Sequence, residues 1–175
     1  MKFLFKLVLV LVVLLVATWF YGRSLERDHI VSSSITLIAP ADSVWRVVRN
    51  FETQPNWWSA LKSSKRLVGR PRETWEQDMG RSGIVRFEIR SETPGRRLVT
   101  EILNDDQQDF GGTWTYDVVT TGAGTEITIT ENGWVETPLY RVVSKWMGKH
   151  RTIDSYLRSL AGVYGEIANP RHGDL

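Results

Sequence analysis

The chain has 175 residues, of which 42% are hydrophobic and 24% are charged, so it can form one globular domain of ordinary size. It contains no cysteine, which excludes disulfides, thiolate metal sites and a cysteine nucleophile. Without Lys2, Lys6 and Arg23, which lie in or beside an N-terminal apolar run, the 22 basic residues become 19, against 20 acidic ones. The remaining chain is nearly neutral, which argues against a nucleic-acid partner.

The N-terminal run is apolar over 3–21 except for Lys6 and Thr18, and about 20 apolar residues are enough to span a bilayer core. It ends in aromatic residues, which are typical of a membrane interface. We therefore predict a single-pass anchor in the cell membrane over 1–23. A cleaved signal sequence is the alternative, because positive charge also precedes the apolar core of such sequences. That charge places the following domain on the extracytoplasmic side.

The rest of the sequence divides into a linker over 24–30, one folded domain over 31–169 and a tail over 170–175. Alternating apolar residues predict strands, apolar residues three or four positions apart predict helices, and glycine and proline mark the turns. The connections between most strands have hairpin length, which predicts an antiparallel sheet. The expected order is a strand over 31–39, helices over 41–51 and 57–61, strands over 64–68, 73–79, 83–90, 97–103, 113–119 and 125–134, and a last helix over 137–167.

The last helix organises this prediction. Its apolar residues recur at steps of three and four from Leu139 through Trp146 to Ile167, and Pro138 fits the first helical position. Such a helix would be roughly 45 Å long and would need a broad apolar partner. The strands can supply this partner as one curved sheet. We therefore predict an α+β fold in which a curved antiparallel sheet surrounds a long C-terminal helix, preceded by one N-terminal transmembrane helix.

Four stretches of the sequence resemble a known superfamily. They are ITLIAPADSVWRVV over 35–48, FETQPNWW over 51–58, GTWTY over 112–116 and GTEITI over 124–129. Together with the last helix, they are similar to the START-like, or SRPBCC, superfamily, and more narrowly to its polyketide cyclase/dehydrase and lipid-transport group. The resemblance covers roughly 30–168 and implies a helix-grip fold with an apolar cavity between sheet and helix. Members bind sterols, lipids, hormones, polyketides or quinones, and some catalyse reactions.

The candidate ligand-binding residues fall on the inward side of the predicted strands and last helix, or beside the expected mouth of the cavity. An imidazole or a carboxylate facing a cavity can orient a polar group of a ligand, and an imidazole can act as a catalytic general base. The competing interpretation is that these side chains only pack the interior or lie at its rim. The candidates are Trp58, Trp75, Phe87, Trp114, Tyr116, Glu131, Trp146 and His150, with His150 as the candidate base.

Three other groups of residues are interpreted from their spacing. Adjacent tryptophans cannot both point inward from a helix, so of Trp57 and Trp58 one could gate the cavity and the other touch the bilayer, unless both simply pack. The basic run over 62–72 is expected to protect a solvated strand edge, with contact to anionic lipid headgroups as the alternative. The acidic run at Asp105, Asp106 and Asp109 lacks calcium-loop spacing, so we predict no metal and no cofactor.

The function that we predict is membrane-tethered binding of a hydrophobic small molecule or lipid in a cavity between sheet and last helix. The first alternative is an enzyme of the cyclase or dehydratase kind that uses His150 as general base. The second is an interaction domain at the membrane that holds no ligand. The sequence contains no phosphate-binding glycine loop, nucleophile elbow or zinc pattern, so it favours no other enzyme class.

Overall fold

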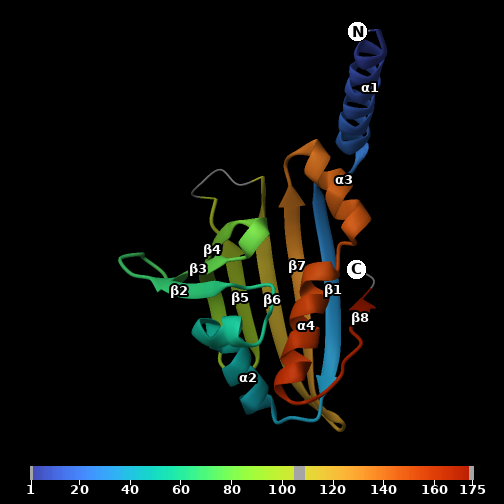
Figure 1. Ribbon diagram of the computed structural model, residues 1–175. Coiled ribbons are helices and arrows are strands. Elements are labelled where there is room, and N and C mark those ends of the chain that lie inside the picture. Colours follow the sequence, from blue (N-terminus) through green and yellow to red (C-terminus); the bar gives the residue numbers. More distant parts are fainter. Residues whose placement is uncertain (1, 105–108, 174–175) are drawn as a thin grey trace.

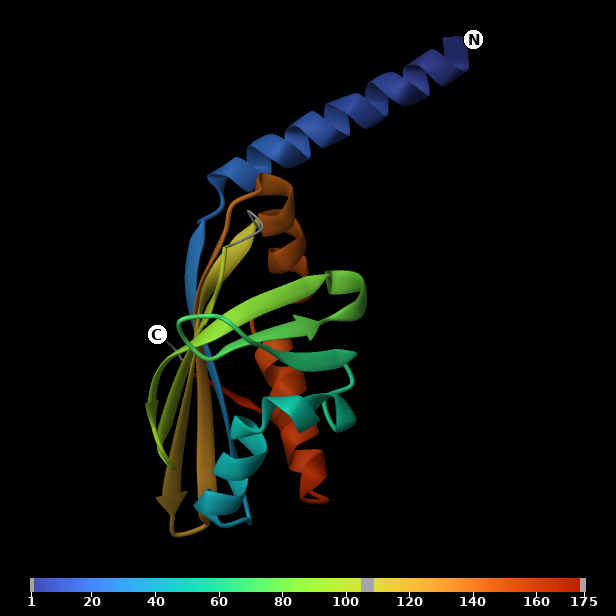
Figure 2. The same ribbon diagram turned by 90° about the vertical axis from the view of Figure 1, so that its left-hand side faces the viewer.

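The computed structural model of the chain describes residues 2–104 and 109–173, so Asp105 and Asp106 lie outside the described residues. Helix α1 (Lys2–Ser24) projects from a sheet that carries helices on one face (Figures 1 and 2). Among the described residues α1 is the one helix long and apolar enough to cross a membrane, and none of its apolar window is buried. A signal sequence shares these properties. At 1.5 Å per residue, α1 is about 35 Å long, which exceeds the hydrocarbon core of a bilayer.

One open sheet confirms the predicted antiparallel arrangement. Its order is β2–β3–β4–β5–β6–β7–β1–β8, and each pair of neighbours is antiparallel. Chain neighbours pair from β2 to β7, as tight turns dictate, and the first strand closes the order beside β7. The strands are β1 (Asp28–Leu37), β2 (Ser63–Leu67), β3 (Thr74–Asp78), β4 (Ile84–Thr93), β5 (Arg97–Ile102), β6 (Phe110–Thr121), β7 (Gly124–Val135) and β8 (Arg171–Gly173).

The helices gather on the inner face of the sheet. Helix α4 (Arg151–Val163) lies across β7 and β1 and buries Ile153, Leu157 and Leu160 completely (Figure 1). Helix α2 (Ala41–Arg49) and the 3-10 helix η1 (Phe51–Asn56) cover the end of the sheet farthest from α1. A second 3-10 turn, η2 (Gly80–Ser82), precedes β4, and helix α3 (Pro138–Met147) follows β7.

The single helix predicted over 137–167 is wrong, because the chain forms α3 and α4 with a break between them. Gly148 ends α3 with φ +86°, a left-handed conformation that side chains other than glycine rarely adopt. The apolar spacing continues through the break, so periodicity alone does not reveal it. The two helices therefore turn different faces toward the sheet, and residues before Gly148 do not share the environment of those after it.

Three shorter segments also differ from the prediction. The linker is confined to residues 25–27, because β1 already begins at Asp28. The predicted tail contains β8, which pairs with Ser32, Ser33 and Ser34 of β1. The predicted helix over 57–61 is wrong, since these residues form turns after η1. In each case a long-range pairing or a proline-containing 3-10 helix overrides the local pattern.

Candidate functional site

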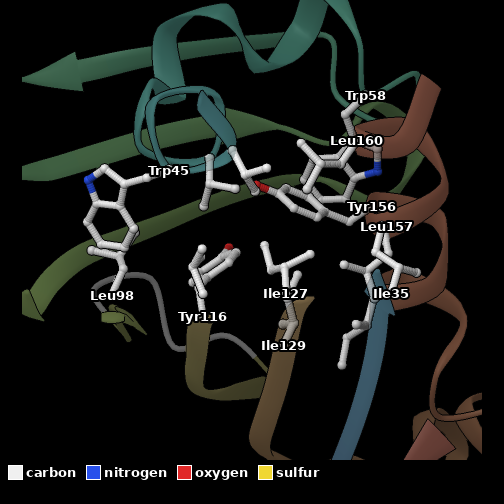
Figure 3. Packing of buried hydrophobic residues seen from close by; sticks show 14 of the residues in the cluster. Ile35, Trp45, Trp58, Leu98, Tyr116, Ile127, Ile129, Tyr156, Leu157 and Leu160 are labelled. Atoms are coloured by element: carbon white, nitrogen blue, oxygen red, sulfur yellow. The ribbon is translucent and has the colours of Figure 1, made fainter. Parts of the chain in front are cut away.

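Aromatic rings occupy the space between α4 and the sheet. Tyr156 of α4 is the centre of this cluster, and its ring centroid lies 5.1 Å from that of Trp57 and 5.0 Å from that of Trp58. Trp114 and Tyr116 approach Tyr156 from β6, at 6.1 and 5.8 Å (Figure 3 shows Trp58, Tyr116 and Tyr156). These edge-to-face contacts pack the region where we predicted an apolar cavity. Both adjacent tryptophans reach Tyr156, which is possible because their segment is not helical.

The predicted site residues Trp75 and Phe87 belong to the buried core around Phe51, and not to the ring cluster around Tyr156. Both rings contact Phe51, at centroid distances of 5.4 and 5.0 Å. The indole N–H of Trp75 donates to Glu73, whose carboxylate also accepts from Arg49 at 2.7 Å. The hydrogen bonds from Arg49 hold the pKa of Glu73 below its ordinary value, so this carboxylate stays ionised and anchors the Trp75 ring.

Glu131 lies on the inner face of β7, as its alternation predicted, and it is half-buried. Its Oε2 atom accepts the indole N–H of Trp114 at 3.0 Å, and its Oε1 atom lies 3.1 Å from Nε2 of His29. His29 stands opposite Gly133 in the register of β1 and β7, so the pairing of these strands brings the imidazole to the carboxylate. Glu131 thus connects the aromatic cluster to the part of the sheet nearest α1.

His150 is separate from this group. Its Nδ1 atom lies 3.2 Å from Oγ of Ser33, which donates to the buried carboxylate of Asp154 at 2.8 Å. The ring of His172 stacks on His150 with centroids 3.9 Å apart, and Nε2 of His172 lies 3.0 Å from Asp154 Oδ2. Burial, and then the charge of His172, lower the pKa of His150. The candidate base is therefore neutral at neutral pH and lies among β1, β8 and the start of α4.

Trp146 does not point inward, which corrects the prediction made from the helical stripe. Its side chain is 85% exposed, and no residue of α3 is buried. Helix α3 contacts α1 instead: a Cβ atom on Gly22 would come within 2.2 Å of the carbonyl oxygen of Pro138. Nζ of Lys145 also donates to the hydroxyl of Tyr21 at 3.0 Å. The end of α1 therefore holds α3 beside it.

A cavity of about 300 Å³ lies beneath α3, at the end of the sheet nearest α1. Strands β1 and β7 contribute His29 and Val135, which point to the inner face, and α3 forms the opposite wall. The hydrogen bond from His29 to Glu131 ties this wall to Trp114. The lining residues are Ser24, Leu25, Glu26, Arg27, His29, Val135, Arg141, Ser144, Lys145 and Lys149.

The basic run over 62–72 lies far from this cavity. β2 forms the edge of the sheet remote from β1, and Lys65 and Arg72 pair with Glu76 and Glu88, each at 2.8 Å. These ion pairs favour the interpretation as a solvated strand edge. A second hollow, of about 380 Å³, is lined by residues 66–73 alone and lies within this same connection between strands.

Sequence reasoning missed the residues that connect the site. Tyr156 follows Ile153 by three positions, so the helical stripe could have included it. His29 has the same parity as Ser33 and Ile35, and an earlier start of β1 would have turned it inward. Asp154 lies four positions after His150 on one helical face. Nothing local indicates His172, because β8 forms only by pairing with β1.

Comparison with known proteins gives one family. Residues 28–163 match the model of a family described as polyketide cyclase / dehydrase and lipid transport. No curated protein matches the sequence. The match covers β1 to the end of α4, which is nearly the whole of the folded domain.

Several solved structures share the fold. The Zhui aromatase/cyclase from Streptomyces sp. R1128 has a TM-score of 0.64 at 16% identity, over 79% of this chain and 94% of that one. A START superfamily protein from Mycobacterium smegmatis has a TM-score of 0.62 at 20% identity, over 77% and 96%. The di-domain ARO/CYC StfQ from the steffimycin biosynthetic pathway has a TM-score of 0.63 at 11% identity. The match covers 78% of this chain and 50% of StfQ. At these identities the likeness is one of fold.

Proposed function

The chain belongs to the polyketide cyclase/dehydrase and lipid transport family, and from this premise we propose that its domain is tethered to the cell membrane by α1 and binds a hydrophobic small molecule or lipid. The polar end of the ligand lies beneath α3, because aromatic rings already fill the space between α4 and the sheet. The observation that carries this proposal is the cavity of about 300 Å³ between the inner face of the sheet and α3.

The size and position of the cavity support the proposal. Its volume falls at the lower end of the range for small-molecule sites. Only residues 25–27 separate α1 from β1, and three extended residues reach at most roughly 10 Å. A ligand leaving the bilayer beside α1 therefore meets the cavity without crossing bulk water. Of the remaining candidates, Glu131 contacts His29 and Trp114 contacts Glu131. Trp58 and Tyr116 pack deeper, around Tyr156, and do not line the cavity.

The geometry gives less support to a cyclase or dehydratase reaction based on His150. Its imidazole is engaged with Ser33 and stacked on His172, and it does not line the cavity, although its neighbour Lys149 does. A general base must reach the proton that it removes. The second alternative, a domain without a ligand, is an outcome of the experiment that follows.

The test is to fill the cavity. Ser144 lines it from α3, and Ser144→Phe introduces a phenyl ring there. With a ligand bound, the added ring overfills the cavity, which typically costs about 1–3 kcal/mol. The amount of ligand retained should therefore fall roughly tenfold. The measurement is lipid extraction and native mass spectrometry of the purified full-length chain.

The matched control is Thr152→Phe, which adds the same ring at an exposed position of α4. Ligand retention should be unchanged in this variant. A wild-type chain that carries no lipid or other hydrophobic molecule, or equal retention in both variants, would contradict the proposal.

A further inference from the structure

The cavity beneath α3 gathers positive charge. Four of its lining side chains are basic, and one is acidic, Glu26. The whole chain has a formal net charge of only +2, so this is a local concentration and not a general property of the surface. The basic residues come from two segments, since Arg27 precedes β1 and Arg141, Lys145 and Lys149 lie on or just after α3.

Two of the four basic side chains, Arg141 and Lys145, face neutral partners. The guanidinium of Arg141 donates to the backbone carbonyl oxygens of Val135 at 2.8 Å, Glu136 at 2.8 Å and Leu25 at 3.3 Å. These bonds fix the side chain but cancel no formal charge. Lys145 donates to the hydroxyl of Tyr21, which is also neutral. Arg27 does pair with a carboxylate, that of Glu136 at 2.7 Å. A rigid arginine and two lysines therefore remain to attract an anion.

The position of the cavity along α1 identifies the source of that anion. The apolar run over 3–21 has a helical length of roughly 28 Å, which matches the hydrocarbon core of a bilayer. The cavity begins at Ser24, the last residue of α1, which lies roughly 5 Å farther along the axis. With α1 across the bilayer, as proposed above, this depth is the headgroup layer. Arg23 lies over the ring of Trp19, with its guanidinium carbon 4.9 Å from the centroid, as expected at this interface.

We propose that this cavity binds the phosphate-bearing headgroup of an anionic membrane phospholipid. The inference rests on the tethered binding proposed above and names its ligand class. Arg141 uses three of its five N–H groups on backbone carbonyls, so it offers a phosphate its fixed positive charge and its remaining N–H groups. The lysines act as mobile point charges around it. The acyl chains remain along α1 and beside the exposed apolar side chains of α3, which include Leu139 and Val143. The lining of the cavity has a net positive charge, so it favours a headgroup with a net negative charge. Phosphatidylglycerol has such a headgroup, because its phosphodiester has no amine to neutralise it.

The test uses the full-length chain in nanodiscs of phosphatidylcholine with a minority of phosphatidylglycerol. After gentle detergent release, native mass spectrometry counts each lipid that stays on the protein. Each lysine near an anionic surface raises the affinity for it roughly fivefold. The double variant K145Q/K149Q should therefore lower phosphatidylglycerol retention roughly twenty-five-fold. The matched control is K62Q/K65Q, which removes two lysines from the remote edge at β2. Retention in the control should equal that of the wild type.

The arms of the experiment separate this inference from the proposed function. If the wild type retains phosphatidylcholine and phosphatidylglycerol equally, binding stands and the headgroup assignment is wrong. If it retains neither lipid, both proposals are wrong. An equal loss in the two double variants would show general surface attraction and would overturn the site. Displacement of phosphatidylglycerol by millimolar inorganic phosphate alone would reassign the cavity to a free anion, and unchanged retention supports a lipid.

Discussion

Glu131 joins two side chains that are far apart in the sequence, His29 and Trp114. One carboxylate thus connects the wall of the cavity to the ring cluster around Tyr156, which is fully buried. Half-buried polar groups are costly unless they are bonded, so this carboxylate, imidazole and indole hold each other in place. A ligand that displaces His29 would therefore also disturb the hydrogen bond between Glu131 and Trp114, which lies deeper in the domain.

His150 makes the stability of the domain depend on pH. Its pKa in the folded state is lowered from 6.5, by burial first and by His172 second, while Asp154 and Glu131 act in the opposite direction. Between the two pKa values, the unfolded chain binds more protons than the folded one, so protonation favours unfolding. The contribution is fully present above pH 6.5 and is lost as pH falls from 6.5 through the folded pKa. Urea unfolding at stepped pH should show this decrease.

His150→Gln is the matched variant, because its amide can hydrogen-bond Ser33 but does not titrate. The slope of the free energy of unfolding against pH should be smaller in this variant, just below pH 6.5, than in the wild type. An identical slope in both proteins would show that His150 is not the source of the pH dependence.

At the scale of the element, local patterns predict strands better than they predict the site. Tyr116 was assigned to the inner face by alternation and is buried there, as are Ile127 and Ile129 of the next strand. Trp146 was misplaced because a helical stripe was continued through Gly148, whose left-handed backbone ends α3. His172 could not be found, since β8 exists only through pairing with a strand about 140 residues earlier. The site depends on these long-range contacts.

The contact between α1 and α3 gives a prediction at this scale. Gly22→Ala places a methyl group within 2.2 Å of the backbone oxygen of Pro138, which cannot move as a side chain can. We expect α3 to separate from α1, at a cost of about 1–3 kcal/mol for the overpacked contact. Because the chain has no cysteine, Tyr21→Cys and Lys145→Cys can report the separation through a short bismaleimide crosslinker.

Crosslinking of this cysteine pair should be roughly tenfold slower in the Gly22→Ala background, in keeping with the energy of the lost contact. Gly122→Ala is the control, since a Cβ atom there meets no atom within 4 Å. If Gly22→Ala crosslinks as fast as the control, α3 is held by β7 and not by α1.

At the scale of the whole molecule, two connections fix the domain relative to α1: the three residues 25–27 and the packing of α3 on Gly22. Figure 2 shows that the axis of α3 crosses that of α1 and does not continue it. If α1 spans the bilayer, α3 therefore lies along its surface. The exposed apolar side chains of α3, including Val143, Trp146 and Met147, would then enter the interface, where tryptophan is favoured.

A single-cysteine label tests this orientation. Trp146→Cys, labelled with an environment-sensitive dye in the otherwise cysteine-free chain, should emit at shorter wavelength in nanodiscs than in a water-exposed control. The control is Val68→Cys, a site that is 93% exposed in the connection between β2 and β3. Brominated lipids should quench the label at position 146 and leave that at 68 unchanged, because a dye at the interface lies close to the acyl chains. Equal emission and quenching at both positions would place α3 in water and would remove the route by which a lipid reaches the cavity.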